Sequence, residues 1–150
     1  MRGPTGFLLL LFRVVTLEDI KLMPFQPLLM EDTTGIVAEK DGEIWAITVL
    51  DNWSPNSCSV HIWIPNPLVF RHGYKEEVFD FVFGSGRNKI IGQTPSDNPK
   101  ALKFIEHIGF EEIFRIKDAV EVGVDLVLTE FTKERYEQQK KDSSTGVRRI

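Results

Sequence analysis

The chain has 150 residues, of which 42% are hydrophobic and 27% charged, so its length and composition predict one folded domain with a hydrophobic core. This balance excludes collagen, coiled coils and wholesale disorder. Its 18 basic and 22 acidic side chains give a formal net charge of −4, without the basic excess typical of nucleic-acid-binding proteins. The single cysteine, Cys58, excludes an internal disulfide and a thiolate zinc cluster, and it favours a cytoplasmic location.

The first apolar segment predicts a buried strand over residues 6–15. Its longest uninterrupted apolar run, residues 7–12, is much shorter than the roughly 20 residues that span a bilayer, and no small-residue cleavage site follows it. We therefore expect neither a membrane span nor a signal peptide. Thr16 with Asp19 has the form of a capping box, which predicts a short helix that Pro24 keeps from continuing.

Three antiparallel strands are expected next. Residues 35–40 and 43–50 are rich in β-type side chains, and Asp41-Gly42 between them supplies the positive φ angles of a tight hairpin turn. A loop containing proline, asparagine and serine then leads to a third strand over residues 58–64.

The second half of the sequence alternates between helical and strand patterns. Tyr74, Val78, Phe81 and Val82 recur at helical spacing, and two glycines end that helix near residue 84. A short strand over residues 88–93 precedes a helix that Asn98 caps and that runs to about His107. Two strands and a charged helix follow, over residues 111–116, 122–129 and 133–140. We expect one α+β domain over residues 1–140, with a mixed, mostly antiparallel sheet flanked by helices, and a polar tail over residues 141–150.

One local motif resembles a known family. The helix that begins at Asn98-Pro99-Lys100-Ala101 and ends at Gly109-Phe110 is similar to the Asn-x-x-Ala…Gly-Phe signature of the GNAT acetyltransferases. The segments around residues 12–20 and 125–136 resemble the opening and closing parts of the same family, so the resemblance covers roughly residues 10–137. It implies the acyl-CoA N-acyltransferase fold, with acetyl-CoA as co-substrate and a primary amine as acceptor.

The resemblance also implies where acetyl-CoA binds. A loop before a helix would hold the pyrophosphate, and here it comprises Arg71, His72, Gly73, Tyr74 and Lys75. In the family, small residues are common where this chain has Tyr74 and Lys75, so the loop is degenerate. The backbone of Ile62, Trp63 and Ile64 would supply an oxyanion donor, and Asn98 would contact the pantetheine arm.

Catalysis in this family requires a base for the amine and a proton donor for the leaving thiolate. The family's donor tyrosine matches Ile105, which cannot donate, so Tyr74, Ser96 or water would have to serve. His61 is a candidate base, and alternation along its strand places it on the same face as Trp63. The alternative for His61 is an ordinary hydrogen-bonded strand histidine. His72 and His107 have no spacing that suggests a metal site.

Two other sets of residues have competing interpretations. Trp45, Trp53 and Trp63 could form an aromatic acceptor pocket, although tryptophans near antiparallel strands more often pack in the core. Cys58 could react if it were exposed, but a lone cysteine usually behaves as a small hydrophobic residue.

The leading functional hypothesis is an acetyl-CoA-dependent N-acetyltransferase acting on a primary amine of a small molecule or protein. The alternative is a catalytically degenerate GNAT-like protein with an assembly or interaction role, for example in a phage virion. A third hypothesis is an acyltransferase for a protein target that residues 17–30 would recognise. The expected binding partners are acetyl-CoA, the amine acceptor, and either a protein partner or a second copy of the chain in a homodimer. We expect no binding to nucleic acid or to a membrane. The expected location is the cytoplasm, or, for a phage protein, the host cytoplasm or the virion.

Overall fold

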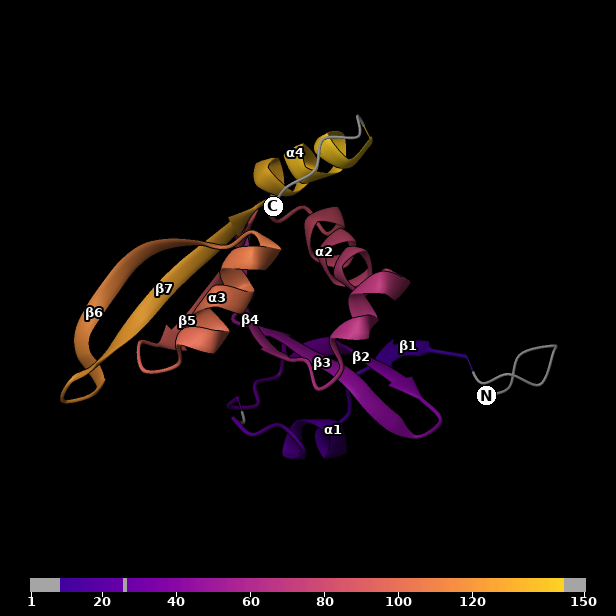
Figure 1. Cartoon of the computed structure of the whole chain (residues 1–150), viewed down its shortest axis with the longest axis horizontal. Helices are drawn as coiled ribbons and strands as arrows, with labels where there is room; N and C mark the ends of the chain where they lie inside the picture. The colour runs from indigo at the N-terminus through magenta and orange to yellow at the C-terminus, as the bar shows by residue number, and fades with distance from the viewer. Residues whose placement is uncertain (1–8, 26, 145–150) are drawn as a thin grey trace.

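A single mixed sheet organises the structure, a computed structural model that describes residues 9–25 and 27–144 (Figure 1). In this part of the chain seven strands lie in the order β1-β2-β3-β4-β5-β7-β6. Only β4 and β5 pair in parallel; the other neighbours are antiparallel. The strands are β1 (Leu11–Val14), β2 (Thr34–Lys40), β3 (Glu43–Asp51), β4 (Ser57–Trp63), β5 (Lys89–Pro95), β6 (Glu111–Glu121) and β7 (Val124–Thr132).

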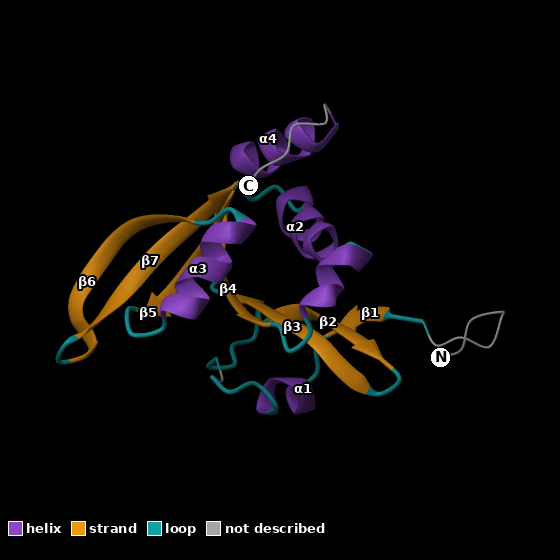
Figure 2. Cartoon of the chain, in the orientation of Figure 1, coloured by secondary structure: helices purple, strands orange, loops and turns teal. Residues whose placement is uncertain are grey.

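Helices cover the two faces of the sheet unequally (Figure 2). The short α1 lies on one face, whereas α2 and α3 lie on the other, and α4 follows the last strand. In the described residues no helix has the length and apolar character needed to cross a membrane. The helices are α1 (Leu17–Lys21), the 3-10 helix η1 (Pro67–His72), α2 (Tyr74–Gly84), α3 (Pro99–Ile108) and α4 (Lys133–Ser144).

The capping box at the start of α1 is confirmed. The Thr16 hydroxyl accepts a hydrogen bond from the backbone N–H of Asp19, and the Asp19 carboxylate accepts one from the backbone N–H of Thr16. Arg13 on β1 also donates to both carboxylate oxygens, at 2.7 and 2.9 Å. This guanidinium lowers the pKa of Asp19 to about 2. The first part of the expected strand, residues 6–8, lies outside the described residues.

The hairpin of β2 and β3 also follows the sequence prediction. Asp41 and Gly42 form its two-residue turn with φ angles of 54° and 76°, and Lys40 pairs with Glu43. Successive residues of β3 point to opposite faces, so Ile47 and Val49 pack with α1 while Ala46 and Leu50 pack toward α2. The strand is therefore buried on both faces.

An aromatic cluster forms the core between α2, α4 and the far half of the sheet. The rings of Phe79 and Phe131 lie 5.0 Å apart, and Tyr136 of α4 packs against both. Phe83 and Phe110 complete the cluster. The core thus joins α2, β7 and α4 through aromatic side chains.

Two expectations about local structure were wrong, whereas α2 contains Phe81 as its helical spacing predicts, with that side chain 48% exposed beside the ring of Trp53. A loop was expected after residue 116, but β6 continues to Glu121. Its pairing with β7 resumes there after a shift in register, with Glu121 opposite Val124. The last helix continues past residue 140 to Ser144, while residues 145–150 of the expected tail lie outside the described residues.

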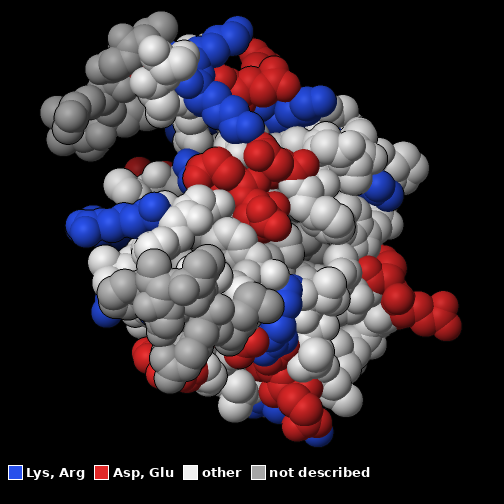
Figure 3. Space-filling model, turned by 90° about the vertical axis from the view of Figure 1, so that its right-hand side faces the viewer, with Lys and Arg blue, Asp and Glu red and all other residues white. Residues whose placement is uncertain are grey.

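The surface charges are mixed on the face that β1 borders. Figure 3 shows blue and red groups interspersed there, without a continuous basic surface. Exposed acidic residues of α2, among them Glu77 and Asp80, lie near basic residues of α4 such as Lys140, which donates to Asp80 at 2.7 Å. This face therefore offers no extended complement to a phosphate backbone.

Candidate active site

The sheet opens between its two parallel strands. Hydrogen-bonded pairing of β4 with β5 extends from Ser57 opposite Lys89 to Val60 opposite Gly92 and no further. Beyond that point, residues 61–63 pair only with β3, and residues 93–95 pair only with β7. The strands therefore diverge, and the backbone groups on their facing edges have no partner strand.

A cleft of about 340 Å³ occupies this opening. Met23, Pro24 and Phe25, which follow α1, form one end of it. Residues of α3 form the other end, and residues of the two diverging strands form its walls. Since α1 and α3 lie on opposite faces of the sheet (Figure 1), a cleft lined by residues next to both helices connects the two faces. Its lining there consists of Asn98, which caps α3, and of Ala101, Phe104 and Ile105 within the helix.

His61 lies on the wall of the cleft and is held by a carboxylate. Its Nε2 lies 3.0 and 3.2 Å from the two carboxylate oxygens of Asp51. Asp51 is buried, with its side chain 5% exposed, whereas the imidazole is 28% exposed. If Nε2 carries the proton of this contact, Nδ1 of the neutral ring is left to accept a proton.

Sequence reasoning missed Asp51, although the hairpin register could have indicated it. Val49 pairs with His61 and Asp51 with Ser59, so Asp51 is the diagonal neighbour of His61 on the same face of the sheet. The same register places Trp63 on that face, opposite Ile47, as alternation predicted. A second cavity of about 300 Å³ adjoins this point, and its lining includes Asp51, His61, Leu28 and Met30.

Ile62 and Trp63 line the cleft, but Ile64 packs against the core beneath α2 instead. Asn98 has two roles. Its Oδ1 caps α3 by accepting a hydrogen bond from the backbone N–H of Ala101, and the residue also lines the cleft. Ile105 also lines the cleft, so the side chain that replaces the family's tyrosine does face the opening.

The loop before α2 is only partly arranged as predicted. Gly73 has a φ of 82° and begins α2 without a side-chain cap, which leaves backbone N–H groups of the first turn available. Arg71 and His72 are exposed, and the His72 ring lies beside that of Trp45. Lys75 points elsewhere: its Nζ donates to the backbone oxygen of Ile108 and to Gln139 Oε1. The Lys75 ammonium group is therefore engaged by α3 and α4.

The structure speaks against Tyr74 as a proton donor. Its hydroxyl donates to the backbone oxygen of Ile36 and contacts the Thr48 hydroxyl, both at 2.7 Å. The side chain is 2% exposed and does not line the cleft, and burial raises its pKa. Tyr74 therefore ties α2 to β2 and β3.

Ser96 is likewise engaged in the fold. Its hydroxyl accepts from the backbone N–H of Asp125, and its own N–H donates to the backbone oxygen of Asp125, each at 2.8 Å. These bonds fasten the end of β5 to the start of β7. Ser96 does not line the cleft.

The remaining reactive and aromatic candidates are mostly structural. Cys58 is buried, and desolvation raises its thiol pKa to about 12, so it stays protonated. Trp45 lies in the core and Trp53 packs at its edge, so of the three tryptophans Trp63 alone lines the cleft. Among the described residues no group of three His, Cys, Asp or Glu side chains could hold a metal ion.

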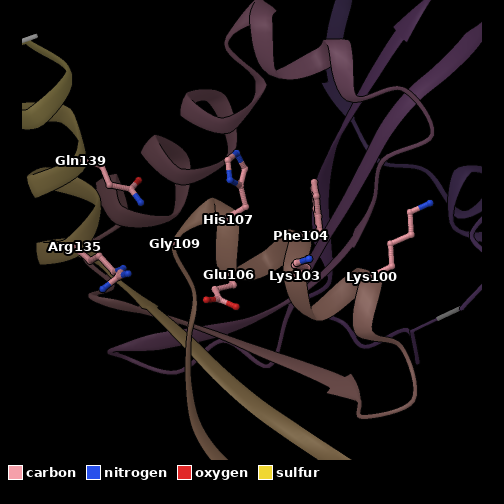
Figure 4. A pocket seen from close by; sticks show the side chains of 8 residues that line it. All are labelled: Lys100, Lys103, Phe104, Glu106, His107, Gly109, Arg135 and Gln139. Atoms are coloured by element: carbon pink, nitrogen blue, oxygen red, sulfur yellow. The ribbon is translucent and has the colours of Figure 1, made fainter. Parts of the chain in front are cut away.

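A larger, more open hollow of about 830 Å³ lies between α3 and α4 (Figure 4). Lys100, Lys103 and His107 lie on α3 and Arg135 on α4, so its rim carries several basic groups. Phe104 lines both this hollow and the cleft, and its ring packs 5.8 Å from that of Phe70 on η1. Sequence reasoning did not select the two lysines, because lysines on a helix face usually point into solvent.

Comparison with known proteins gives a likeness of fold. No family model and no curated protein matches this sequence. Among solved structures, the spermidine/spermine N-acetyltransferase SpeG from Vibrio cholerae is similar, with a TM-score of 0.65 and 18% identity over 87% of this chain and 96% of that one. An acetyltransferase assigned to the GNAT family, from Desulfovibrio desulfuricans, is also similar. Its TM-score is 0.55, with 14% sequence identity over 67% of this chain and 68% of that one. This chain has the GNAT fold.

A third solved structure supports the same conclusion about the fold. A protein described as a phosphinothricin N-acetyltransferase has a TM-score of 0.61 and 17% identity over 82% of this chain and 98% of its own. The α+β architecture with a mixed, mostly antiparallel sheet and flanking helices is therefore confirmed. Among the strands that the structure describes, the one parallel pair, β4 and β5, is the pair that opens.

Proposed function

We propose that this protein transfers an acetyl group from acetyl-CoA to a primary amine. The observation that carries the proposal is the open cleft between the diverging ends of β4 and β5, with His61 fixed in its wall by Asp51. A cleft that reaches both faces of the sheet lets a thioester and an amine meet from opposite sides. Holding the two together in this way accounts for much of the catalysis that such a site needs.

The reaction forms one bond and breaks another at the thioester carbon. The amine, once deprotonated, attacks that carbon, and the carbon–sulfur bond breaks to release CoA as a thiolate. His61 Nδ1 accepts the amine's proton, directly or through a water. A backbone N–H on the unpaired edge of residues 61–63 donates to the developing oxyanion.

Water protonates the departing thiolate in this proposal. Ile105 has no proton to donate, the Tyr74 hydroxyl is buried, and the Ser96 hydroxyl is bonded at the end of β5. Water is therefore the proton donor that is left for the thiolate. A thiolate is a good enough leaving group to need little assistance at neutral pH.

The charges around the α3 end of the cleft suit the phosphates of acetyl-CoA. Backbone N–H groups at the start of α2 and the exposed Arg71 follow Phe70, whose ring packs against that of Phe104 on α3. Lys100 and Lys103 lie on α3 itself and line the hollow that Phe104 also lines. We propose that these basic groups compensate for Lys75, while Asn98 contacts the pantetheine arm where α3 meets the cleft.

The alternative is a non-catalytic assembly or interaction protein, such as a phage virion component. A protein with only a structural role would be expected to fill the space between β4 and β5 with side chains, and the open cleft therefore favours the enzyme. A cytoplasmic location, a homodimer and a protein acceptor docked on residues 17–30 remain secondary proposals. Light scattering on the purified protein tests the homodimer directly.

The proposal is tested by calorimetric titration of the purified protein with acetyl-CoA and, separately, CoA. We expect saturable binding, weakened about tenfold by Arg71→Ala and by Lys103→Ala, since each removes a charge-assisted contact to phosphate. Lys117→Ala, an exposed lysine on β6, is the matched control and should leave binding unchanged. Absence of binding at millimolar ligand would remove the acetyltransferase assignment.

A further inference from the structure

We infer that the acceptor is a monoamine with an apolar carbon skeleton that enters the cleft from the α1 side. This inference rests on the proposed function and narrows its substrate class. It comes from the exposed apolar side chains on that side and from the carboxylate of Asp51, both oxygens of which already contact His61.

The segment after α1 presents unusually exposed apolar side chains at the opening. Phe25 is 74% exposed, Leu28 81% and Met30 53%, and each lines one of the two cavities that share His61. Met23 and Trp63 continue this apolar wall toward the interior of the cleft. Exposed apolar groups that gather at a cavity mouth indicate a ligand that covers them.

Charge distinguishes between amine classes at this site. Among the described residues that line the cleft there is no Asp, Glu, Lys or Arg. The adjoining cavity has one carboxylate, Asp51, and His61 already occupies both of its oxygens. A polyamine would therefore bring a second ammonium group into a site without a free carboxylate, and a desolvated, unpaired charge is strongly unfavourable.

A monoamine meets no such obstacle. Its single ammonium group loses a proton before attack, and His61 is the group in the wall that accepts it. The imidazolium then formed lies beside Asp51, which stabilises the charge at 3.0 Å. The apolar skeleton of the substrate remains against Phe25, Leu28 and Met30, where its burial favours binding.

The test uses two amines of equal length that differ in one charged group. Free CoA released by the full-length protein is measured with a thiol reagent, using acetyl-CoA and either hexylamine or hexamethylenediamine. We expect kcat/KM to be about tenfold or more higher for hexylamine, because only the diamine brings an unpaired ammonium group. Equal or faster turnover of the diamine, or of spermidine, would overturn the inference while leaving the acetyltransferase proposal intact.

A substitution at the cavity wall tests the physical cause. Met30→Asp adds a carboxylate to the cavity that His61 also lines and should reduce the preference for hexylamine several-fold by improving turnover of the diamine. Leu22→Asp is the matched control, since Leu22 is similarly exposed at 56% but lines neither cavity. An unchanged preference in Met30→Asp, or an equal change in Leu22→Asp, would contradict the assignment of this wall to the acceptor.

Binding measurements separate failure of the inference from failure of the proposed function. Ligand-observed NMR with hexylamine and hexamethylenediamine reports the amine site without any acetyl transfer. Selective binding of hexylamine that Met30→Asp weakens supports the inference even if acetyl-CoA does not bind and the acetyltransferase proposal fails. Equal or stronger binding of the diamine overturns it in either case.

Discussion

β3 and β6 are both long strands of one sheet, yet their surroundings are opposite. From Trp45 to Asp51 every residue of β3 is buried, whereas every residue of β6 is exposed. Helices lie against both faces of β3, and β2 and β4 pair with its edges. β6 is an edge strand that pairs only with β7.

The two strands also contribute differently to the candidate site. The buried strand carries Asp51 at its end and so holds His61 in a fixed position. The exposed strand β6 contributes Val120 to the wall of the cleft, and its neighbour β7 contributes Leu126. A buried strand therefore positions the candidate base, and an exposed edge strand lines the other side of the cleft.

The strongest test of this comparison is one substitution made in both strands. Ile47→Ala on β3 removes a side chain with no exposure and should lower the free energy of unfolding by about 2–5 kcal/mol. Ile113→Ala on β6, where the side chain is 50% exposed, should change it by about 0.5 kcal/mol or less. Urea denaturation measures both, and similar losses would show that β6 is buried in solution, for example in a homodimer.

Two tyrosine hydroxyls form hydrogen bonds that hold helices in place, Tyr74 between α2 and β2 and Tyr136 between α4 and α2. Removing each hydroxyl compares how much the two bonds stabilise the fold. Tyr74→Phe leaves the partly buried backbone oxygen of Ile36 without the hydroxyl donor and the buried Thr48 hydroxyl without its partner, and we expect a loss of about 1–3 kcal/mol. Tyr136→Phe on α4 should cost about 1 kcal/mol or less, because its partner Asp80 stays accessible to water. Thermal unfolding compares the two variants.

The same Tyr74→Phe protein tests catalysis. Its kcat should match that of the wild type below the melting transition, because the hydroxyl does not reach the cleft. A large fall in kcat with KM unchanged would restore Tyr74 as the proton donor.

The pH dependence of stability should reflect the buried carboxylate near β1. Since Arg13 lowers the pKa of Asp19 from 3.8 to about 2, the ionised carboxylate stabilises the fold above about pH 4, and this contribution is lost as pH falls from about 4 to 2. We expect about 1–2 kcal/mol, reduced because Arg13 is one-third exposed.

Asp19→Asn should flatten the pH dependence in that window, measured by urea denaturation between pH 2 and pH 5. Glu112→Gln, which removes an exposed ion pair on β6, should leave the curve unchanged. If both substitutions changed the pH dependence of stability equally, the ion pair near β1 would contribute no more than the exposed ion pair on β6, contrary to this prediction.

The smallest expected effect concerns the two hairpin turns. Gly42 and Gly123 have positive φ angles of 76° and 88°, and an added Cβ would meet no atom at either position. Gly42→Ala should lower the free energy of global unfolding by about 1 kcal/mol, because β2 and β3 unfold only with the whole core. Gly123→Ala should lower it less, since the end of the β6–β7 hairpin opens locally, which hydrogen exchange can detect.

The sequence by itself predicted the elements whose signals are local. The capping box at Thr16, the positive φ angles at Asp41-Gly42, and the cap at Asn98 depend on residues a few positions apart, and the structure confirms each of them. The alternation that placed His61 and Trp63 on one face also needed only strand geometry. Together with the motif from Asn98 to Phe110, these signals were sufficient for the fold.

Only the tertiary structure decided what the individual side chains do there. Asp51 becomes the partner of His61 through strand register, Lys75 turns to Ile108 and Gln139, and the hydroxyl of Tyr74 ends between β2 and β3. Each of these contacts joins groups at least ten positions apart in sequence. A local pattern cannot report them, because the bond that each polar group forms depends on which distant strand or helix packs beside it.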